Sequence, residues 1–296
     1  MSFLQANLVC VVLVAIDLIA RTWRLQWILR GLHFRVPFSE VFTLNVVGDA
    51  ASAVTPLRVG GDPTRLAALT QARVPVAAGV VAILIEIAVM WPVIIAAAGW
   101  LALIYAPAWW RGAEPHIERT LATAWPWVAA IVAASVMAWW LMRRVAPHAS
   151  LVMRRGTRRA MAYWRRMPAW PLVASIPLTL VSLAARVAIL PVLAMTLSSP
   201  PPMGPLSFAS FLLIYGQLVL PTPSGMGVVE LGFLGGAVGD LGASHRAILL
   251  IWRMYTTFVF VAFGALLGIQ RYGSVAVGAM LRGRGLGTHR EPDSEP

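Results

Sequence analysis

Long apolar segments separated by short polar stretches dominate the chain, and their lengths match helices that cross a membrane. The clearest segments cover residues 3–20, 76–105, 125–142, 170–197 and 245–270. A helix needs about 20 mostly apolar residues to cross the hydrocarbon core of a bilayer. The pattern therefore predicts an all-α fold, a polytopic transmembrane helix bundle.

Residues 38–55 form a shorter and more polar segment that ends at a proline and two glycines. We expect a half-helix, or a helix sheltered by its neighbours, because the segment is too polar to face lipid. Asp62 followed by Pro63 predicts the N-cap of a helix that runs to residue 71. Gly60 and Gly61 are expected to leave amides at that N-terminus open to an anion, although a simple capped turn explains the same residues.

The second interrupted stretch lies between residues 208–220 and 228–242, inside one of the most apolar regions. Its motif contains Pro223, Gly225, Gly227 and Glu230. Proline removes an amide donor and glycine leaves helical dihedrals easily, so the helix is expected to break there. Backbone freed in this way must be buried in protein or line a wet cavity. A packed helix kink with Glu230 near the headgroups is the alternative.

The two interruptions share a pattern. Thr55-Pro56 precedes Gly60 as Thr222-Pro223 precedes Gly227, with the glycine four residues after the proline in both. Paired, interrupted apolar segments in two halves indicate a transporter with inverted repeats. We therefore predict two broken or re-entrant helix hairpins related as an inverted repeat, and leave open whether each segment spans the membrane or returns.

Isolated charges within apolar runs indicate a polar interior. Glu86 lies near the middle of residues 76–105, and Arg186 lies well away from either end of residues 170–197. A charge at such depth is expensive, so both side chains are expected to face the bundle interior and a partner. Snorkelling of Arg186 to the surface is the other interpretation.

Composition agrees with one membrane domain. Of 296 residues, 59% are hydrophobic and 12% are charged, about half of the roughly 25% typical of soluble domains. We assign residues 1–275 to the membrane domain and residues 276–296 to a disordered cytoplasmic tail. The lone Cys10 excludes a disulfide framework and a cysteine-based metal site.

All 24 basic residues are arginines, and the net charge is +12. They gather at the ends of apolar segments without a nucleic-acid motif, so anionic lipid headgroups are the expected counter-charge and nucleic acid is not. Eight arginines between residues 143 and 166, with no acid among them, indicate a cytoplasmic loop. We interpret Arg21 and Arg24 as a cytoplasmic flank of the first span. The protein is then expected to be a multi-pass protein of the cell (inner or plasma) membrane, with its N-terminus outside and its C-terminus in the cytoplasm.

Enzymatic motifs are missing from the sequence. The five histidines are scattered, and neither a Gly-x-Ser-x-Gly elbow nor a P-loop is present. No cofactor, metal or enzymatic activity is therefore expected. A membrane enzyme with Ser224 as nucleophile is a minor alternative.

Three motifs give a family resemblance. The stretches from Thr55 to Arg65, from Leu220 to Glu230 and from Ile251 to Arg253 resemble those of the lysylphosphatidylglycerol synthase transmembrane region family, the flippase-like integral membrane proteins. The resemblance covers roughly residues 3–270. It implies lipid translocation, without the aminoacyl-transfer domain of full-length synthases.

The chain departs from the family pattern at two places. Glu86 is followed by Ile87 where the family has arginine, and Asp62 stands where the family has glutamate. The resemblance also implies that Glu230 and Arg253 matter more than Asp17 or Asp240.

The leading hypothesis is a flippase or transporter of an anionic phospholipid or lipid-linked intermediate. Arginines would bind the headgroup phosphate, and carboxylates would balance them in the empty state. The alternative hypothesis, from another functional class, is a scaffold that binds partner proteins of envelope biosynthesis. The sequence leaves the oligomeric state open. The predicted substrate-binding residues are Arg58, Gly60, Gly61, Asp62, Arg65, Glu86, Arg186, Pro223, Gly225, Gly227, Glu230 and Arg253.

Overall fold

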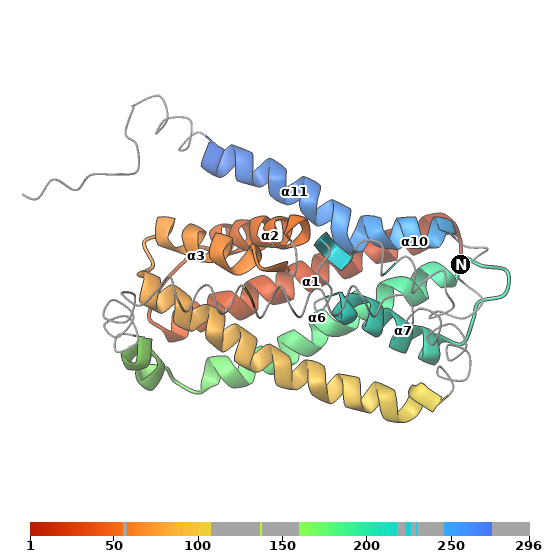
Figure 1. The fold of residues 1–296 in the computed structure, drawn as a ribbon, viewed down its shortest axis with the longest axis horizontal. Helices are drawn as coiled ribbons and strands as arrows, with labels where there is room; N and C mark the ends of the chain where they lie inside the picture. The colour runs from red at the N-terminus through yellow and green to blue at the C-terminus, as the bar shows by residue number, and fades with distance from the viewer. Residues whose placement is uncertain are drawn as a thin grey trace, which may run out of the picture.

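Helices make up the fold wherever the chain is described in our computed structural model (Figure 1). The described residues are 1–55, 58–107, 137, 160–217, 223–225, 229 and 246–273. Within these ranges there is no β-strand. The predicted all-α class is confirmed.

The helices follow one another as long and short elements. They are α1 (Phe3–Gly31), α2 (Phe38–Val54), α3 (Gly61–Gln71), the helix Val76–Pro107, α6 (Trp170–Ala194), α7 (Met203–Gly216), the short 3-10 turn η2 (Pro223–Gly225), α10 (Arg246–Arg253), the π-helical turn η4 (Met254–Phe258), α11 (Val259–Gly268) and the π-helical turn η5 (Ile269–Gly273). Four helices in the described part are long and apolar enough to cross a membrane: Phe3–Gly31, Val76–Pro107, Trp170–Ala194 and Arg246–Arg271.

Two predicted boundaries were wrong. The first helix does not end at residue 20 but continues to Gly31, because no proline or glycine interrupts residues 21–30 and most of them are good helix formers. The helix before the second motif ends at Gly216, ahead of the prolines.

Helices α1 and α6 pack side by side and run antiparallel. At one end, the amino group of Met1 donates to the carbonyl oxygen of Met195. At the other end, a Cβ on Gly31 would lie 2.7 Å from Cγ of Pro171. The contact therefore extends along the full length of both helices.

Helix α2 is held between α3 and the last long helix. Gly264 on α11 allows the closest approach, because a Cβ there would lie 2.5 Å from Cβ of Ala50 and 2.5 Å from the carbonyl oxygen of Val46. Small residues at such crossings let helix backbones approach closely in membranes. At the end of this contact, an exposed ion pair joins Arg271 to Glu40 at 2.9 Å.

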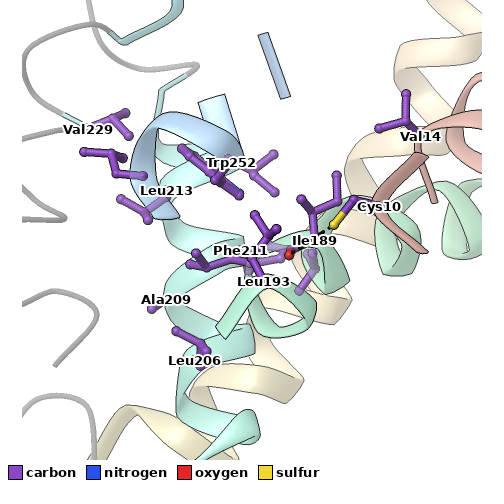
Figure 2. Close-up of a cluster of buried hydrophobic side chains, with 14 of the residues drawn as sticks. Cys10, Val14, Ile189, Leu193, Leu206, Ala209, Phe211, Leu213, Val229 and Trp252 are labelled. Carbon is purple, nitrogen blue, oxygen red and sulfur yellow. Dashed lines mark hydrogen bonds between the residues drawn. The ribbon is translucent and has the colours of Figure 1, made fainter. Parts of the chain in front are cut away.

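Two hydrophobic clusters form the core of the described part. One includes residues 10–18 of α1 and 183–194 of α6 (Figure 2). The other includes residues 25–32 of α1 and 78–85 of the following long helix. A gap on α1 between Leu18 and Leu25 separates the two clusters, and charged side chains occupy it.

Several predictions concern residues outside the described ranges. These are the span 125–142, most of the basic loop 143–166, the segment 228–242 and the tail 276–296. The inverted repeat, the re-entrant hairpins and the orientation in the membrane stay predictions.

The close α2–α11 crossing makes Gly264 sensitive to substitution. We expect Gly264→Ala to destabilise the protein by about 1–3 kcal/mol, because the new methyl group meets backbone that cannot move aside easily. Thermal unfolding in mild detergent measures the effect.

Gly268→Ala is the matched control on the same helix. A Cβ there would lie 3.7 Å from Val47, an ordinary contact, and alanine favours the helix over glycine by roughly 1 kcal/mol. Equal melting temperatures for the two variants would contradict the close crossing.

Candidate functional site

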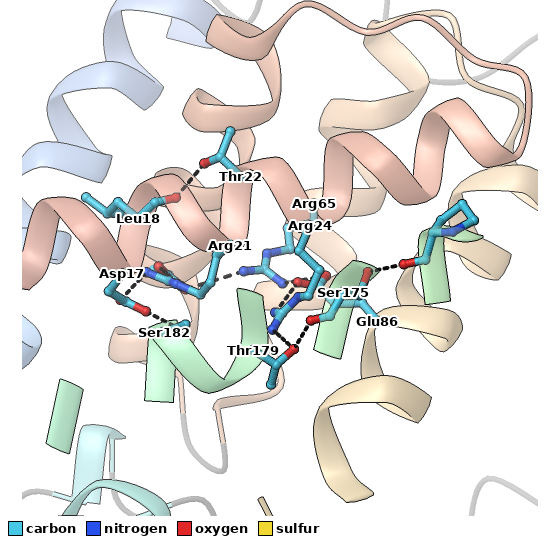
Figure 3. Close-up of polar contacts among 12 residues, drawn as sticks. Asp17, Leu18, Arg21, Thr22, Arg24, Arg65, Glu86, Ser175, Thr179 and Ser182 are labelled. Carbon is cyan, nitrogen blue, oxygen red and sulfur yellow. Dashed lines mark hydrogen bonds and ion pairs between the residues drawn. The ribbon is translucent and has the colours of Figure 1, made fainter. Parts of the chain in front are cut away.

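Three charged side chains of α1 lie on one face of the helix and point into the protein (Figure 3). Asp17, Arg21 and Arg24 are spaced by four and three residues, which places them on one stripe of an α-helix. Their exposed fractions are 1%, 6% and 3%. Arg21 and Arg24 lie in the gap between the two hydrophobic clusters, and Asp17 lies at its edge.

The carboxylate of Asp17 forms ion pairs with two arginines. Its Oδ2 lies 3.0 Å from Nη2 of Arg21 and accepts a hydrogen bond of 2.8 Å from Nε of Arg186. The hydroxyl of Ser182 donates to Oδ1 of the same carboxylate. Arg186 therefore faces the bundle interior and has a carboxylate partner, as expected.

Two further ion pairs connect α1 to other elements. Arg21 lies 2.6 Å from Asp49 on α2, and Arg24 lies 2.6 Å from Glu86 on the helix Val76–Pro107. Arg24 also donates to the hydroxyl of Thr179 on α6 at 3.1 Å. Four helices thus meet at one layer of charge.

Arg65 of α3 lies between Oδ1 of Asp49 and Oε2 of Glu86, the carboxylate oxygens that do not contact Arg21 or Arg24. Its amino groups are 3.5 Å from Asp49 and 3.4 Å from Glu86, longer than the other pairs. Its buried Nε has no hydrogen-bond partner among the described residues. Gly48 makes room for this side chain, since a Cβ there would lie 2.6 Å from Cγ of Arg65.

A cavity of about 200 Å³ opens beside these pairs. Its polar wall carries the arginines 21, 24, 58, 65 and 186 and the carboxylates Asp49, Asp62 and Glu86. Ile87, Met90 and Ile214 supply apolar surface. Five guanidinium groups therefore face three carboxylates in the described lining, and including Asp17 behind the wall still leaves one positive charge in excess.

Arg58 is the main source of this excess. No ion pair joins it to a carboxylate within the part of the chain that the structure describes. Burial, together with the positive charge of Arg186, lowers the pKa of Arg58 to about 10, so it is still protonated at neutral pH. Its φ of 57° lies in the left-handed region, which is rare for a residue other than glycine. Such strain is typical of functional positions.

The two broken stretches meet. The hydroxyl of Ser224 donates to the carbonyl oxygen of Ala53, at the end of α2, over 3.1 Å. Ser224 and Gly225 both have positive φ, of 49° and 66°. Arg253 donates to the carbonyl oxygens of Ser224 at 2.8 Å and Gly225 at 3.4 Å. This guanidinium thus satisfies backbone groups that leave the helical pattern at the break.

The predicted site residues fall into three groups. Arg58, Asp62, Arg65, Glu86 and Arg186 come together around the cavity. Pro223, Gly225 and Arg253 form the break and its support, beside the cavity residue Gln217: a Cβ on Gly225 would lie 2.7 Å from Cβ of Gln217. Gly227 and Glu230 lie outside the described residues.

Two details at the first break differ from expectation. The amide of Gly60 is not open to an anion, because it donates to the hydroxyl of Thr55 at 2.9 Å. Asp62 is not the N-cap of α3: the helix begins at Gly61, with Gly60 as its N-cap. Gly60 and Gly61 are needed for space, because a side chain on either would collide with Thr55 or Ser52 of α2.

Sequence reasoning missed several residues of the site. Arg21 and Arg24 were placed beyond the end of the first helix, whereas they lie within α1 and are buried, and Asp17 was ranked below Glu230. The spacing of these three residues on one helix face was the signal that could have found them. Thr179, Ser182, Tyr215 and Gln217 also line the cavity or its wall, and no sequence signal distinguishes them.

The arrangement suits an anion better than a metal. Within the described ranges, no group of three histidine, cysteine or acidic side chains could hold a metal ion. Guanidinium groups match phosphate oxygens with paired hydrogen bonds. Buried apolar surface next to this charge would accommodate the adjoining part of an amphipathic molecule.

These features define a polytopic helical membrane protein with a charged cavity between its spans. A family model described as "Lysylphosphatidylglycerol synthase TM region" matches residues 2–264. The chain belongs to this family, whose members are membrane proteins of lipid biosynthesis or transport. No curated protein and no solved structure gave a match.

The Arg24–Glu86 pair provides a test of the buried charge layer. Both side chains are 4% exposed. We expect Glu86→Leu to destabilise the protein by about 3–5 kcal/mol, because it leaves Arg24 buried without its partner. The double variant Arg24→Met with Glu86→Leu should recover most of that loss, which thermal unfolding in detergent measures.

Glu40→Gln is the control, since it breaks the exposed pair with Arg271 and should change stability by less than about 1 kcal/mol. If the double variant is no more stable than Glu86→Leu, the two charges do not depend on each other and the assignment is wrong.

Proposed function

We propose that the protein moves an anionic phospholipid, or a lipid-linked intermediate with a phosphate, between the two leaflets of the membrane. The observation that carries this proposal is the cavity with five arginines and three carboxylates, whose residues on the spanning helix α1 lie between the two apolar clusters. A fixed excess of buried positive charge is unfavourable without a counter-charge. The phosphate of a lipid headgroup would supply it.

In the proposed mechanism, the carboxylates neutralise the arginines when no lipid is bound. Arg65 is the group best suited to exchange partners, because its distances to Asp49 and Glu86 are the longest in the cavity. Arg58 would bind phosphate without first leaving a carboxylate. The tightly bonded pairs of Arg21 and Arg24 would stay in place and preserve the layer.

The two broken stretches would supply the movement. Hinges absorb large backbone changes at a few residues, and both breaks already contain residues with positive φ. The break near Ser224 contacts the end of α2 through the hydrogen bond from the hydroxyl of Ser224 to the carbonyl oxygen of Ala53. Movement of this contact would open the cavity alternately to either side.

The competing hypotheses are a scaffold and a membrane enzyme. Their outcomes differ in one reconstitution assay. A transporter moves lipid with its chemistry unchanged, an enzyme alters the lipid's mass, and a scaffold does neither. Mass spectrometry of the lipids after the assay separates these cases.

Arg58→Gln is the sharpest test of the transport proposal, because it removes a cation without leaving a described carboxylate unpaired. We expect the movement of labelled phosphatidylglycerol in proteoliposomes to slow by about 10-fold to 100-fold, the loss of one hydrogen bond to a charged group. The melting temperature should change little.

Arg271→Gln is the matched control, since Arg271 is 57% exposed and lies away from the cavity. It should leave the rate within about twofold of wild type. An unchanged rate in Arg58→Gln, at equal protein content, would remove Arg58 from the mechanism.

A further inference from the structure

A second, smaller cavity lies beside the charged one. The two share four lining residues: Arg58, Arg186, Ile214 and Gln217. Beyond these, the smaller cavity is bounded by apolar side chains, by Asp17 and by Tyr255 and Thr256 of the last span. The smaller cavity has a volume of about 10 Å³, enough for one group of the size of a hydroxyl, so the shared residues mark a point where such a group of a bound molecule would be enclosed.

Gln217 is the unusual member of this group. Its side chain is 4% exposed, and its Nε2 donates to the carbonyl oxygen of Ile214 at 2.7 Å. This bond fixes the orientation of the amide, because only the nitrogen can donate to a carbonyl. The opposite atom, Oε1, is buried and has no hydrogen-bond partner among the described residues.

A buried amide oxygen without a partner is unfavourable, and nearly all such groups in folded proteins are satisfied. The neighbouring cavity residues do not donate a hydrogen bond to Oε1 of Gln217. Arg186 is engaged with Asp17, and no bond from Arg58 to Gln217 is formed. A ligand that enters the shared region would need to bring its own donor to make this hydrogen bond.

We propose that Gln217 determines headgroup specificity by accepting a hydrogen bond from a neutral hydroxyl next to the phosphate. The preferred ligand is then a polyol phosphodiester, such as a glycerol or sugar phosphate headgroup. This inference rests on the proposed function for its ligand, a phosphate-bearing lipid.

The sign of the local charge selects the hydroxyl over an ammonium group. Arg58 and Arg186 line both cavities together with Gln217, whereas Asp49, Asp62 and Glu86 line only the larger one. Asp17 lines the smaller cavity but is already bonded to Arg186, Arg21 and Ser182. An ammonium donor would approach two guanidinium groups, and a hydroxyl avoids this repulsion.

Two lipids of equal charge test the proposal. Phosphatidylglycerol carries two headgroup hydroxyls, and phosphatidylpropanol has the same length and charge but none. Purified protein is measured in two ways: the rate of transbilayer movement of each labelled lipid in proteoliposomes, and the amount of each lipid bound in detergent from an equal mixture. We expect wild type to prefer phosphatidylglycerol about tenfold in both measurements.

Gln217→Met removes the acceptor at nearly constant size. It should reduce the preference to about one by weakening phosphatidylglycerol alone, a change of ratio that simple loss of folded protein cannot produce. Gln26→Met is the matched control: Gln26 is also buried, and its Nε2 also donates to a backbone carbonyl, that of Val36 at 3.1 Å, but it lies outside both cavities. It should keep the wild-type ratio.

The outcomes separate the two proposals. A wild-type ratio near one, or a full preference retained in Gln217→Met, overturns the role of Gln217. A greater preference for phosphatidylethanolamine than for phosphatidylglycerol overturns the neutral hydroxyl. If neither lipid moves but the binding ratio still depends on Gln217, the transport proposal fails and the specificity assignment stands.

Discussion

The neutralisation of buried arginines is the constraint on which the rest of the structure depends. Arg21 and Arg24 lie in the second half of the membrane-spanning helix α1 and are buried in the protein, where an unpaired charge is highly unfavourable. Their partners come from α1 itself, from α2 and from the helix Val76–Pro107. Because each pair is formed only when these helices pack in one register, the charges specify how the bundle assembles. The hydrophobic clusters on both sides stabilise the packing of the helices but contribute little to its register.

The same constraint explains the small residues and the breaks around the layer. Arg65 reaches the carboxylates because Gly48 leaves space on α2, and α3 begins close to α2 because Gly60 and Gly61 have no side chains. The freed carbonyls of the second break are bonded by Arg253. Irregular backbone is thus placed where protein groups satisfy it, as the membrane requires.

Sequence reasoning predicted the helical class, four of the spans that the structure describes and five residues of the cavity wall, because apolar length and isolated charge are local signals. It placed the end of α1 wrongly because arginine after an apolar run usually marks the membrane surface, and only packing reveals that Arg21 and Arg24 have interior partners. It also misjudged Gly60, whose amide is satisfied by Thr55, five residues away. No sequence feature identified Gln217, because only the folded structure shows that its Oε1 is buried without a hydrogen-bond partner among the described residues.

A charge layer built for stability alone would have matched numbers of opposite charges at short distances. The cavity departs from this in two respects: Arg58 has no described carboxylate partner, and Arg65 shares two carboxylates at 3.4 and 3.5 Å. The short pairs on α1 hold the helices together, whereas Arg58 lies on the break, with a positive φ, and Arg65 lies on α3, which follows the break. Rigid pairs and incompletely satisfied pairs are therefore separated in space. In the proposed mechanism, binding of an anion would rearrange the second set without unfolding the first.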